Sequence, residues 1–214
     1  FGTARVTKRE LAGELAALLG FVAVGQKDEV GLQLFDRRPG LALPPGADLR
    51  HVLRLVREIV VDSDASGGFE ASEEDGDGSP LAAVLENKAR TLRRRSLVLV
   101  VSDFLEPDPE AWRPQLARLA RRHDVLALRV VDPFELELPR AGLVRMVDGE
   151  SGREIEVDTR SARVLRAWKE AASERTAMLT RQFQRAGVDW TDARTDGDVA
   201  DPLVRLFERR RRRR

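Results

Sequence analysis

Cysteine and tyrosine are both absent from this chain of 214 residues. Without a thiol, the protein forms no disulfide framework, performs no thiol catalysis and binds no metal through thiolates. A chain without cysteine is also compatible with a reducing compartment. We therefore expect a cytoplasmic location for this domain.

Long apolar runs and an excess of one charge are also missing. No stretch approaches the ~20 apolar residues that cross a bilayer, and no basic segment followed by an apolar one opens the chain. The 37 Lys and Arg residues nearly balance the 36 Asp and Glu residues, so whole-chain charge predicts no particular partner. A hydrophobic content of 42% suffices for one sizeable domain.

The beginning of the chain is unusual, because Phe1-Gly2-Thr3 runs directly into a helical pattern and no Met precedes it. We therefore expect the chain to be cut from a longer product. Any membrane anchor is then expected in the part outside this sequence, so that the full-length protein is a candidate for membrane association.

The most informative segment is Ser96–Phe104, with the sequence SLVLVVSDF. A short continuous Val/Leu run between two helical patterns is typical of a strand that is buried on both faces of a parallel sheet. Asp103 is then expected at the carboxyl end of that strand. Ligands of open α/β sheets bind at this edge, so the segment predicts where function is located.

Helical and strand patterns alternate along the rest of the chain. Helices are predicted over 6–24, 48–61, 80–94, 109–122 and 161–186 and from 201 onward, and strands over 29–36, 41–43, 96–103, 124–131, 142–147, 153–157 and 188–191. Residues 62–79 are rich in Gly, Ser and acids and predict an exposed loop. The order predicts a three-layer, Rossmann-like α/β fold, with a mostly parallel sheet and helices on both faces.

Two acids follow the two central predicted strands. A right-handed crossover through the helix 109–122 places Asp103 and Asp132 on one edge of the sheet, where two carboxylates suit a hard cation. The alternative is that each acid only caps the turn or helix that follows it. Spacing alone favours the capping interpretation.

Other candidate motifs are weaker. Gly20–Lys27 resembles a phosphate-binding loop but follows a helix and has its Lys displaced, so we reject it. Ser102, Asp103 and His123 are the residue types of a hydrolase triad, but no Gly-x-Ser-x-Gly elbow surrounds Ser102. At a helix end, a protonated His123 is explained by the helix dipole. Arg209–Arg214 is interpreted as a solvated basic tail rather than a nucleic-acid site, because no aromatic residues accompany it.

The order of four sequence segments resembles that of a known protein family. VGLQLFD, RRSLVLVVSDF, RRHDVLALRVVDP and TDGDVADPLVRLF follow one another as in the domain-of-unknown-function 58 family, which contains a von Willebrand factor A-like domain. The likeness places such a domain over residues 1–208 and leaves 209–214 as a basic tail. In the family, Phe1-Gly2-Thr3 resembles the sequence just after an Asp-x-Ser-x-Ser loop, so the resemblance implies that this loop and the first, central strand before it are missing.

The resemblance also implies a metal-ion-dependent adhesion site. Such a site binds Mg²⁺ through an Asp-x-Ser-x-Ser loop, a hydroxyl from a second loop and an acid from a third, because Mg²⁺ prefers oxygen ligands. The likeness puts the acid at Asp103 and the hydroxyl at Ser79. The Asp-x-Ser-x-Ser loop is absent from this sequence, so we expect weak or no Mg²⁺ binding here.

What the resemblance implies about function is a non-enzymatic protein-interaction domain. Relatives often accompany MoxR-type AAA+ ATPases, which makes an adaptor or chaperone-like role with such a partner the leading interpretation. The alternative is a divalent-metal-dependent hydrolase that uses Asp103 and Asp132. A nucleic-acid binder working through Arg209–Arg214 is the third interpretation.

Overall fold

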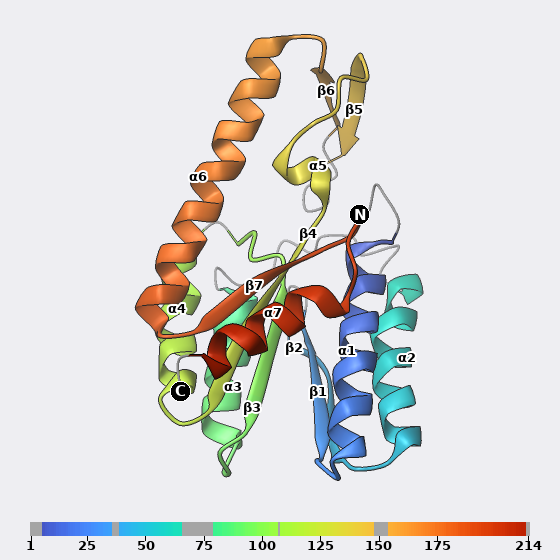
Figure 1. The fold of residues 1–214 in the computed structure, drawn as a ribbon, viewed down its shortest axis with the longest axis vertical. Coiled ribbons are helices and arrows are strands. Elements are labelled where there is room, and N and C mark those ends of the chain that lie inside the picture. The colour runs from blue at the N-terminus through green and yellow to red at the C-terminus, as the bar shows by residue number, and fades with distance from the viewer. Residues whose placement is uncertain (1–5, 36–38, 66–78, 107, 148–153, 213–214) are drawn as a thin grey trace.

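The computed structural model describes residues 6–35, 39–65, 79–106, 108–147 and 154–212 (Figure 1). The helices are α1 (Lys8–Gly25), α2 (Leu49–Ala65), α3 (Pro80–Thr91), α4 (Pro109–Ala120), α5 (Pro133–Leu136), α6 (Ala162–Ala186) and α7 (Ala200–Arg211). The strands are β1 (Val30–Phe35), β2 (Pro39–Gly46), β3 (Leu97–Ser102), β4 (Asp124–Val131), β5 (Leu143–Val147), β6 (Glu154–Asp158) and β7 (Asp189–Arg194). The chain is a mixed α/β protein of the Rossmann-like class, as its alternating pattern predicts.

A parallel sheet of order β3-β4-β7 forms the centre of the molecule. The apolar run of β3 pairs in register with β4, from Leu97 opposite Asp124 to Ser102 opposite Arg129. β4 is buried along almost its whole length, because both of its neighbours are strands and both of its faces are covered. This burial explains why β4 reads as a continuous apolar run rather than an alternating one.

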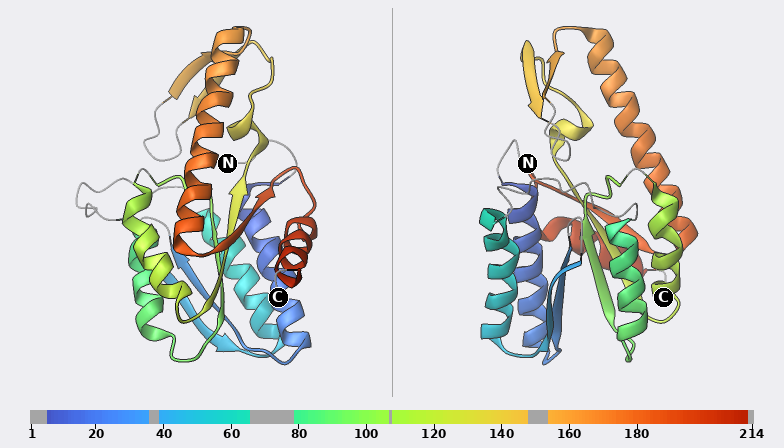
Figure 2. Two further views of the ribbon diagram at one scale, coloured as in Figure 1. Left: turned by 60° about the vertical axis from the view of Figure 1, so that its left-hand side comes forward. Right: turned by 180° about the vertical axis from the view of Figure 1, so that it is seen from behind.

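The two faces of β4 contribute to two separate hydrophobic clusters. Val125 and Ala127 pack with side chains of α3, α4 and α6, whereas Leu126 and Leu128 pack with side chains of α1 and α7. Alternate residues of a strand point to opposite faces, so this division gives the three-layer arrangement that the sequence predicts. Figure 2 shows helices on both sides of the sheet.

The β1–β2 hairpin is a separate antiparallel sheet beside α1 and α2 (Figure 1). Within the described residues, β1 pairs with β2 and β3 pairs with β4, without a β1–β3 ladder. Phe35 of β1 still packs against the cluster that contains Val100 of β3. The two sheets therefore share a core without sharing hydrogen bonds.

An arm extends from the parallel sheet (Figure 2). It consists of α5, the β5–β6 hairpin and the first half of α6. The whole of α6 has 25 residues and, at 1.5 Å per residue, is about 37 Å long. The second half of α6 packs on the sheet through Leu179 and Phe183. Gly187 ends the helix in the left-handed conformation, with φ of 69°, which a residue without Cβ adopts easily.

Several element boundaries differ from the sequence-based predictions. α2 continues to Ala65 and so enters the predicted loop 62–79, most of which lies outside the described residues. β7 is longer than predicted and reaches Arg194. α5 is not predicted, since a single helical turn gives no periodic signal.

Within the described residues, no helix is long and apolar enough to cross a membrane.

Candidate functional site

The candidate site lies at the carboxyl ends of β3 and β4. Asp103 follows Ser102, the last residue of β3, and Asp132 follows Val131, the last residue of β4. The two strands are parallel neighbours, so both acids lie at the same edge of the sheet, as predicted. We call this edge, with Lys8, Asp103, Glu106, Asp132 and Glu135, the carboxyl rim.

Asp103 is displayed outward by an unusual turn. The next residue, Phe104, has φ of 54° and is 2% exposed. A left-handed conformation is strained for a bulky residue, at about 1–3 kcal/mol. The ring of Phe104 offsets this strain by packing against Trp112 and Phe183 in the core. The side chain of Asp103, directly before this residue, is 39% exposed at the rim.

Lys8 joins two carboxylates of the rim. Its Nζ lies 3.2 Å from Oδ2 of Asp103 and also contacts Oε1 of Glu135. The side chains of Lys8 and Glu135 are only 15% and 18% exposed, so this ion pair is shielded from solvent far better than a surface pair. Segments 95 residues apart in the sequence thus meet at one ammonium group.

The position of Lys8 follows from the start of α1. Thr7 caps this helix: its side chain accepts a hydrogen bond from the backbone N–H of Glu10, and the Glu10 carboxylate accepts one from the backbone N–H of Thr7. Such a capping box defines the first turn of a helix. Leu11 and Leu15 then fix α1 against the sheet through their burial in its core. Lys8, at the first helical position, is therefore held beside the rim.

Asp132, like Asp103, accepts a hydrogen bond from the backbone N–H two residues later, but it is far less accessible. It is fully buried, its Oδ1 accepts a hydrogen bond of 2.9 Å from the backbone N–H of Phe134, and its Oδ2 accepts one of 3.2 Å from the hydroxyl of Thr195. The capping interpretation is thus confirmed for Asp132, which is the N-cap of α5. By setting the first turn of α5, Asp132 positions Glu135.

Ser79 is the N-cap of α3. Its Oγ accepts a hydrogen bond of 3.0 Å from the backbone N–H of Ala82 and donates one to the carboxylate of Glu106. Glu106 also accepts a hydrogen bond of 2.9 Å from the backbone N–H of Leu81. No acid stands in the first turn of α3, and Glu106 supplies this negative charge from the loop after β3.

The oxygen atoms predicted to bind Mg²⁺ already have partners. Oδ2 of Asp103 faces the Lys8 ammonium, Oδ1 accepts a hydrogen bond of 3.3 Å from the backbone N–H of Leu105, and the hydroxyl of Ser79 is bonded to Glu106. The part of the chain that the structure describes contains no group of three or more His, Asp or Glu side chains placed to hold a metal ion. Binding of a magnesium ion at Asp103 and Ser79 would require their contacts with Lys8 and Glu106 to break, and it stays a prediction.

Sequence reasoning missed three residues of the carboxyl rim, namely Lys8, Glu106 and Glu135. Only Glu106 has a local signal, since it lies three residues after Asp103 in the same loop. Lys8 looks like an ordinary charged residue at a helix start. Its role depends on tertiary contacts with two distant segments.

The hydrolase triad is excluded by the topology. Ser102 lies at the carboxyl end of β3, whereas His123 precedes β4 at the amino edge of the sheet. In the parallel register, Ser102 is opposite Arg129, six residues beyond His123, which corresponds to roughly 20 Å along the strand. The two side chains therefore belong to opposite edges.

The expectation of a protonated His123 is wrong. His123 is 5% exposed, and neither of its ring nitrogens has a hydrogen-bond partner among the described residues. Burial therefore lowers the pKa of His123, and the positive charge of Arg122 lowers it further. His123 is a neutral side chain of the interior.

The prediction of a solvated tail is wrong for Arg210, whose side chain is only 20% exposed, whereas Arg209 is exposed. α7 continues to Arg211, and the guanidinium of Arg209 donates a hydrogen bond of 3.0 Å to the carbonyl of Trp190. The guanidinium of Arg210 lies 2.5 Å from Asp124 and 3.4 Å from Asp189. These two residues fasten α7 to the amino edge of the sheet.

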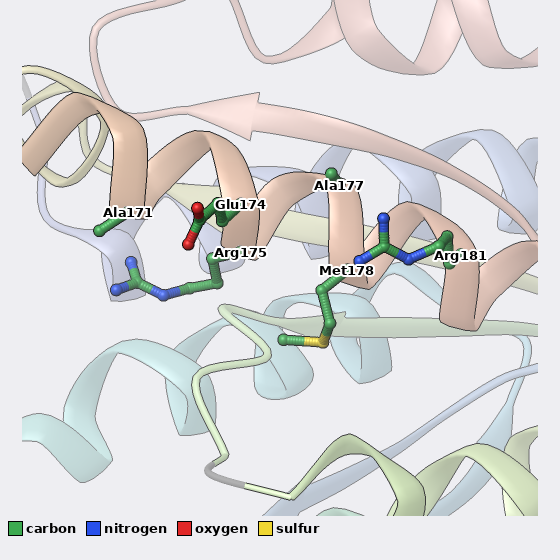
Figure 3. A pocket seen from close by; sticks show the side chains of 6 residues that line it. All are labelled: Ala171, Glu174, Arg175, Ala177, Met178 and Arg181. Carbon is green, nitrogen blue, oxygen red and sulfur yellow. The ribbon is translucent and has the colours of Figure 1, made fainter.

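An open hollow lies along α6 (Figure 3). Its lining consists of Ala171, Glu174, Arg175, Ala177, Met178 and Arg181. Met178 also packs against the core cluster, whereas the other five lining residues are exposed. Such a surface lacks the enclosed, mostly apolar form of a small-molecule site.

Comparison with known sequences places the chain in a family. Residues 1–178 match the family described as protein of unknown function DUF58. Uncharacterized protein Rv1480 of Mycobacterium tuberculosis is 33% identical over 215 residues, which cover 99% of this chain and 63% of that protein. Uncharacterized protein MAV169 of Mycobacterium avium is 36% identical over 134 residues, covering 62% of this chain and 76% of that protein. This chain thus spans less than two thirds of the length of Rv1480.

Two solved structures are similar to this one. The conserved hypothetical protein BatB from Bacteroides thetaiotaomicron superposes with a TM-score of 0.56 at 15% identity, covering 95% of this chain and 87% of that one. An aerotolerance-related membrane protein from Bacteroides fragilis gives a TM-score of 0.55 at 14% identity, covering 94% and 88%. At these identities the likeness concerns the fold alone.

Proposed function

The chain belongs to the DUF58 family, and on that premise we propose that it is a non-enzymatic protein-interaction domain of the von Willebrand factor A type. The observation that carries the proposal is the carboxyl rim, where Asp103 is 39% exposed at the end of a buried strand. Exposed charge on a rigid base suits recognition of a protein surface, because a fixed carboxylate pairs with a partner at little entropic cost.

The partner that we propose is a MoxR-type AAA+ ATPase, with this domain acting as an adaptor or chaperone-like component. The proposal rests on the family resemblance, and the exposed carboxylate of Asp103 supports it. We also propose a cytoplasmic location for the domain, with any membrane anchor lying in sequence outside this chain.

The magnesium ion of a metal-ion-dependent adhesion site stays a prediction. Asp103 and Ser79 would contribute oxygen ligands, and the remaining ligands would come from outside the described residues. Because these two residues already have partners, we expect this chain to bind Mg²⁺ weakly or not at all. A calorimetric affinity tighter than ~10 μM would contradict that expectation.

The open edges of β1 and β3 support a further part of the proposal. In the described residues these strands use one edge each, for β2 and β4, and Phe35 of β1 still packs into the core of β3. We propose that an additional strand of the longer protein pairs with these edges. Hydrogen exchange tests this: the outward amides of β3 should exchange quickly in this chain and slowly in the longer protein. Equal rates in the two would contradict it.

The alternative function is a divalent-metal-dependent hydrolase that uses Asp103 and Asp132. The geometry favours it less, because Asp132 is fully buried and both of its oxygens accept hydrogen bonds from neighbouring groups. A catalytic carboxylate has to reach substrate or a bound water. The proposed interaction domain requires only Asp103 at the surface.

Direct binding tests the proposal. The purified chain is titrated against the MoxR-type ATPase of the same organism by surface plasmon resonance. Asp103→Asn should weaken binding by about tenfold or more, because it removes an interface charge. The matched control Asp158→Asn, on the far arm, should not change it. Absence of binding by the wild-type chain, or equal loss in both variants, contradicts the proposal.

A further inference from the structure

The amino edge of the parallel sheet, opposite the carboxyl rim, is rich in arginine. Three segments reach this edge: residues 93–97 lead into β3, residues 118–123 lead from α4 into β4, and residues 207–212 end α7 beside the starts of β4 and β7. They contain three, three and four arginines, and Glu208 is their single acid. All of these arginines except Arg210 are exposed, and we call the exposed ones the basic edge.

The fold itself does not use up this charge. Asp124 and Asp189, the first residues of β4 and β7, both pair with the partly buried Arg210. A helix dipole favours cations in the last turn, and Lys88 and Arg90 already supply them for α3. The arginines between α3 and β3 are therefore not needed to stabilise the end of that helix.

The two edges of the parallel sheet carry opposite charge. The carboxyl rim has four acids and one lysine, whereas the three segments at the amino edge have many arginines and one acid. The near balance of 37 basic and 36 acidic residues in the whole chain hides this separation. The domain therefore has a positive end that attracts an anionic surface and a negative end that such a surface repels.

Exposed apolar side chains accompany the arginines. Leu97, the first residue of β3, is 50% exposed, and Phe207, one helical turn before Arg211, is 40% exposed. Phe21, near the end of α1, is 44% exposed. Figures 1 and 2 show the end of α1 at the same end of the molecule as the start of β3. Basic and apolar side chains thus share one end of the domain.

This combination suits an anionic membrane surface better than a nucleic acid. Guanidinium groups bind the phosphates of both. Single-stranded nucleic acid also needs aromatic side chains for stacking, and a duplex needs an element that enters a groove. An aliphatic side chain such as Leu97 adds little against a phosphate backbone, whereas apolar side chains beside basic ones enter the boundary between lipid headgroups and acyl chains.

We propose that the basic edge docks this domain on an anionic lipid surface, with Leu97 and Phe207 entering the headgroup boundary. Clustered basic residues bind such a surface through their summed charge, and the binding weakens as salt rises. Because the carboxyl rim lies at the opposite edge, docking holds Asp103 away from the membrane. The contact is made by this chain itself, in addition to any anchor outside it, and does not depend on the proposed ATPase partner.

Co-sedimentation of the purified chain with lipid vesicles tests the proposal. One set of vesicles contains equal parts of phosphatidylglycerol and phosphatidylcholine, and the other contains phosphatidylcholine alone. The test variant neutralises the three arginines that lead into β3, and it combines Arg93→Gln, Arg94→Gln and Arg95→Gln.

A matched control removes the same charge from the arm. Three exposed arginines of the arm are replaced together, as Arg140→Gln, Arg163→Gln and Arg166→Gln. Figure 1 shows the arm and the loop that leads into β3 at opposite ends of the molecule. The two triple variants therefore have the same net charge and differ in where it is lost.

The wild type should bind the phosphatidylglycerol vesicles at low salt, dissociate as salt is raised, and leave phosphatidylcholine vesicles unbound. The test variant should bind roughly tenfold to a hundredfold more weakly than wild type. The control should stay within about threefold of wild type, because its charges lie farther from the surface than the Debye length. Phe207→Ser should weaken binding about fivefold by removing apolar contact.

Failure of the wild type to bind, equal binding to both kinds of vesicle, or an equal loss in the two triple variants overturns the proposal. Unchanged binding by Phe207→Ser overturns the entry of Phe207 into the lipid. A DNA or RNA oligonucleotide that binds more tightly than the vesicles at the same salt would assign the basic edge to nucleic acid and would also overturn it. The choice of lipid and the salt series are measured on wild type, so they decide the matter even if a variant does not fold.

Discussion

β4 and the β5–β6 hairpin are two very different environments within one chain. β4 lies between two strands and two helix layers, and almost all of its side chains are buried. The hairpin pairs only with itself among the described residues, and Leu143 and Ile155 are more than half exposed. The sheet therefore provides a rigid base, while the hairpin adds little burial of its own. The carboxyl rim lies where the two regions meet, since α5, the first element of the arm, follows β4 directly.

The largest expected contrast is between two leucines. Leu128 of β4 is 0% exposed and Leu143 of β5 is 58% exposed. Leu128→Ala should lower the free energy of unfolding by about 2–5 kcal/mol, because it leaves a cavity in the core. Leu143→Ala should change it by less than about 0.5 kcal/mol. Urea denaturation measures both, and similar losses would remove the distinction between base and arm.

A smaller contrast is expected between two aspartates that accept backbone hydrogen bonds. Asp132→Ala removes a buried cap and leaves the backbone N–H of Phe134 and the hydroxyl of Thr195 without this acceptor. We expect a loss of about 2 kcal/mol in the free energy of unfolding. Asp158→Ala, at the exposed end of β6, should cost clearly less. Thermal denaturation of the two variants compares them, and a larger effect at Asp158 would contradict the assigned roles.

The smallest predicted effect concerns pH. Burial lowers the pKa of His123 in the folded state, so below its ordinary value of 6.5 the unfolded chain binds more protons at this site. This contribution to stability is complete above pH 6.5 and is lost as the pH falls through the lower folded-state pKa. The melting temperature of the wild type should decline across this range. In His123→Leu the decline should be shallower, and an identical decline would show that His123 does not cause it.

The sequence predicts the central parallel sheet better than it predicts the carboxyl rim. The Val/Leu runs of β3 and β4 predict buried parallel strands, because a strand that is covered on both faces needs apolar residues at consecutive positions. Asp103 and Asp132 follow directly, since they stand at the ends of those runs. The metal site at Asp103 and Ser79 and the partner of the domain remain predictions.

The remaining features of the rim depend on tertiary contacts. Lys8 meets Asp103 and Glu135 only after α1 has docked on the sheet, and no spacing pattern encodes a contact across 95 residues. The separation of β1 from β3 also cannot be predicted from the sequence, because the pattern of a strand does not determine which strand it pairs with. The neutral state of His123 follows from burial rather than from its place at a helix end.

A double-mutant cycle between Lys8 and Glu135 tests the central claim, that this ammonium bridges the carboxyl rim. The free energy of unfolding is measured for wild type, Lys8→Met, Glu135→Gln and the double variant. The account predicts that the two single losses exceed the double loss by about 1–2 kcal/mol, because the pair is poorly exposed. Losses that add to within about 0.3 kcal/mol would mean that the two side chains do not interact, and would contradict it.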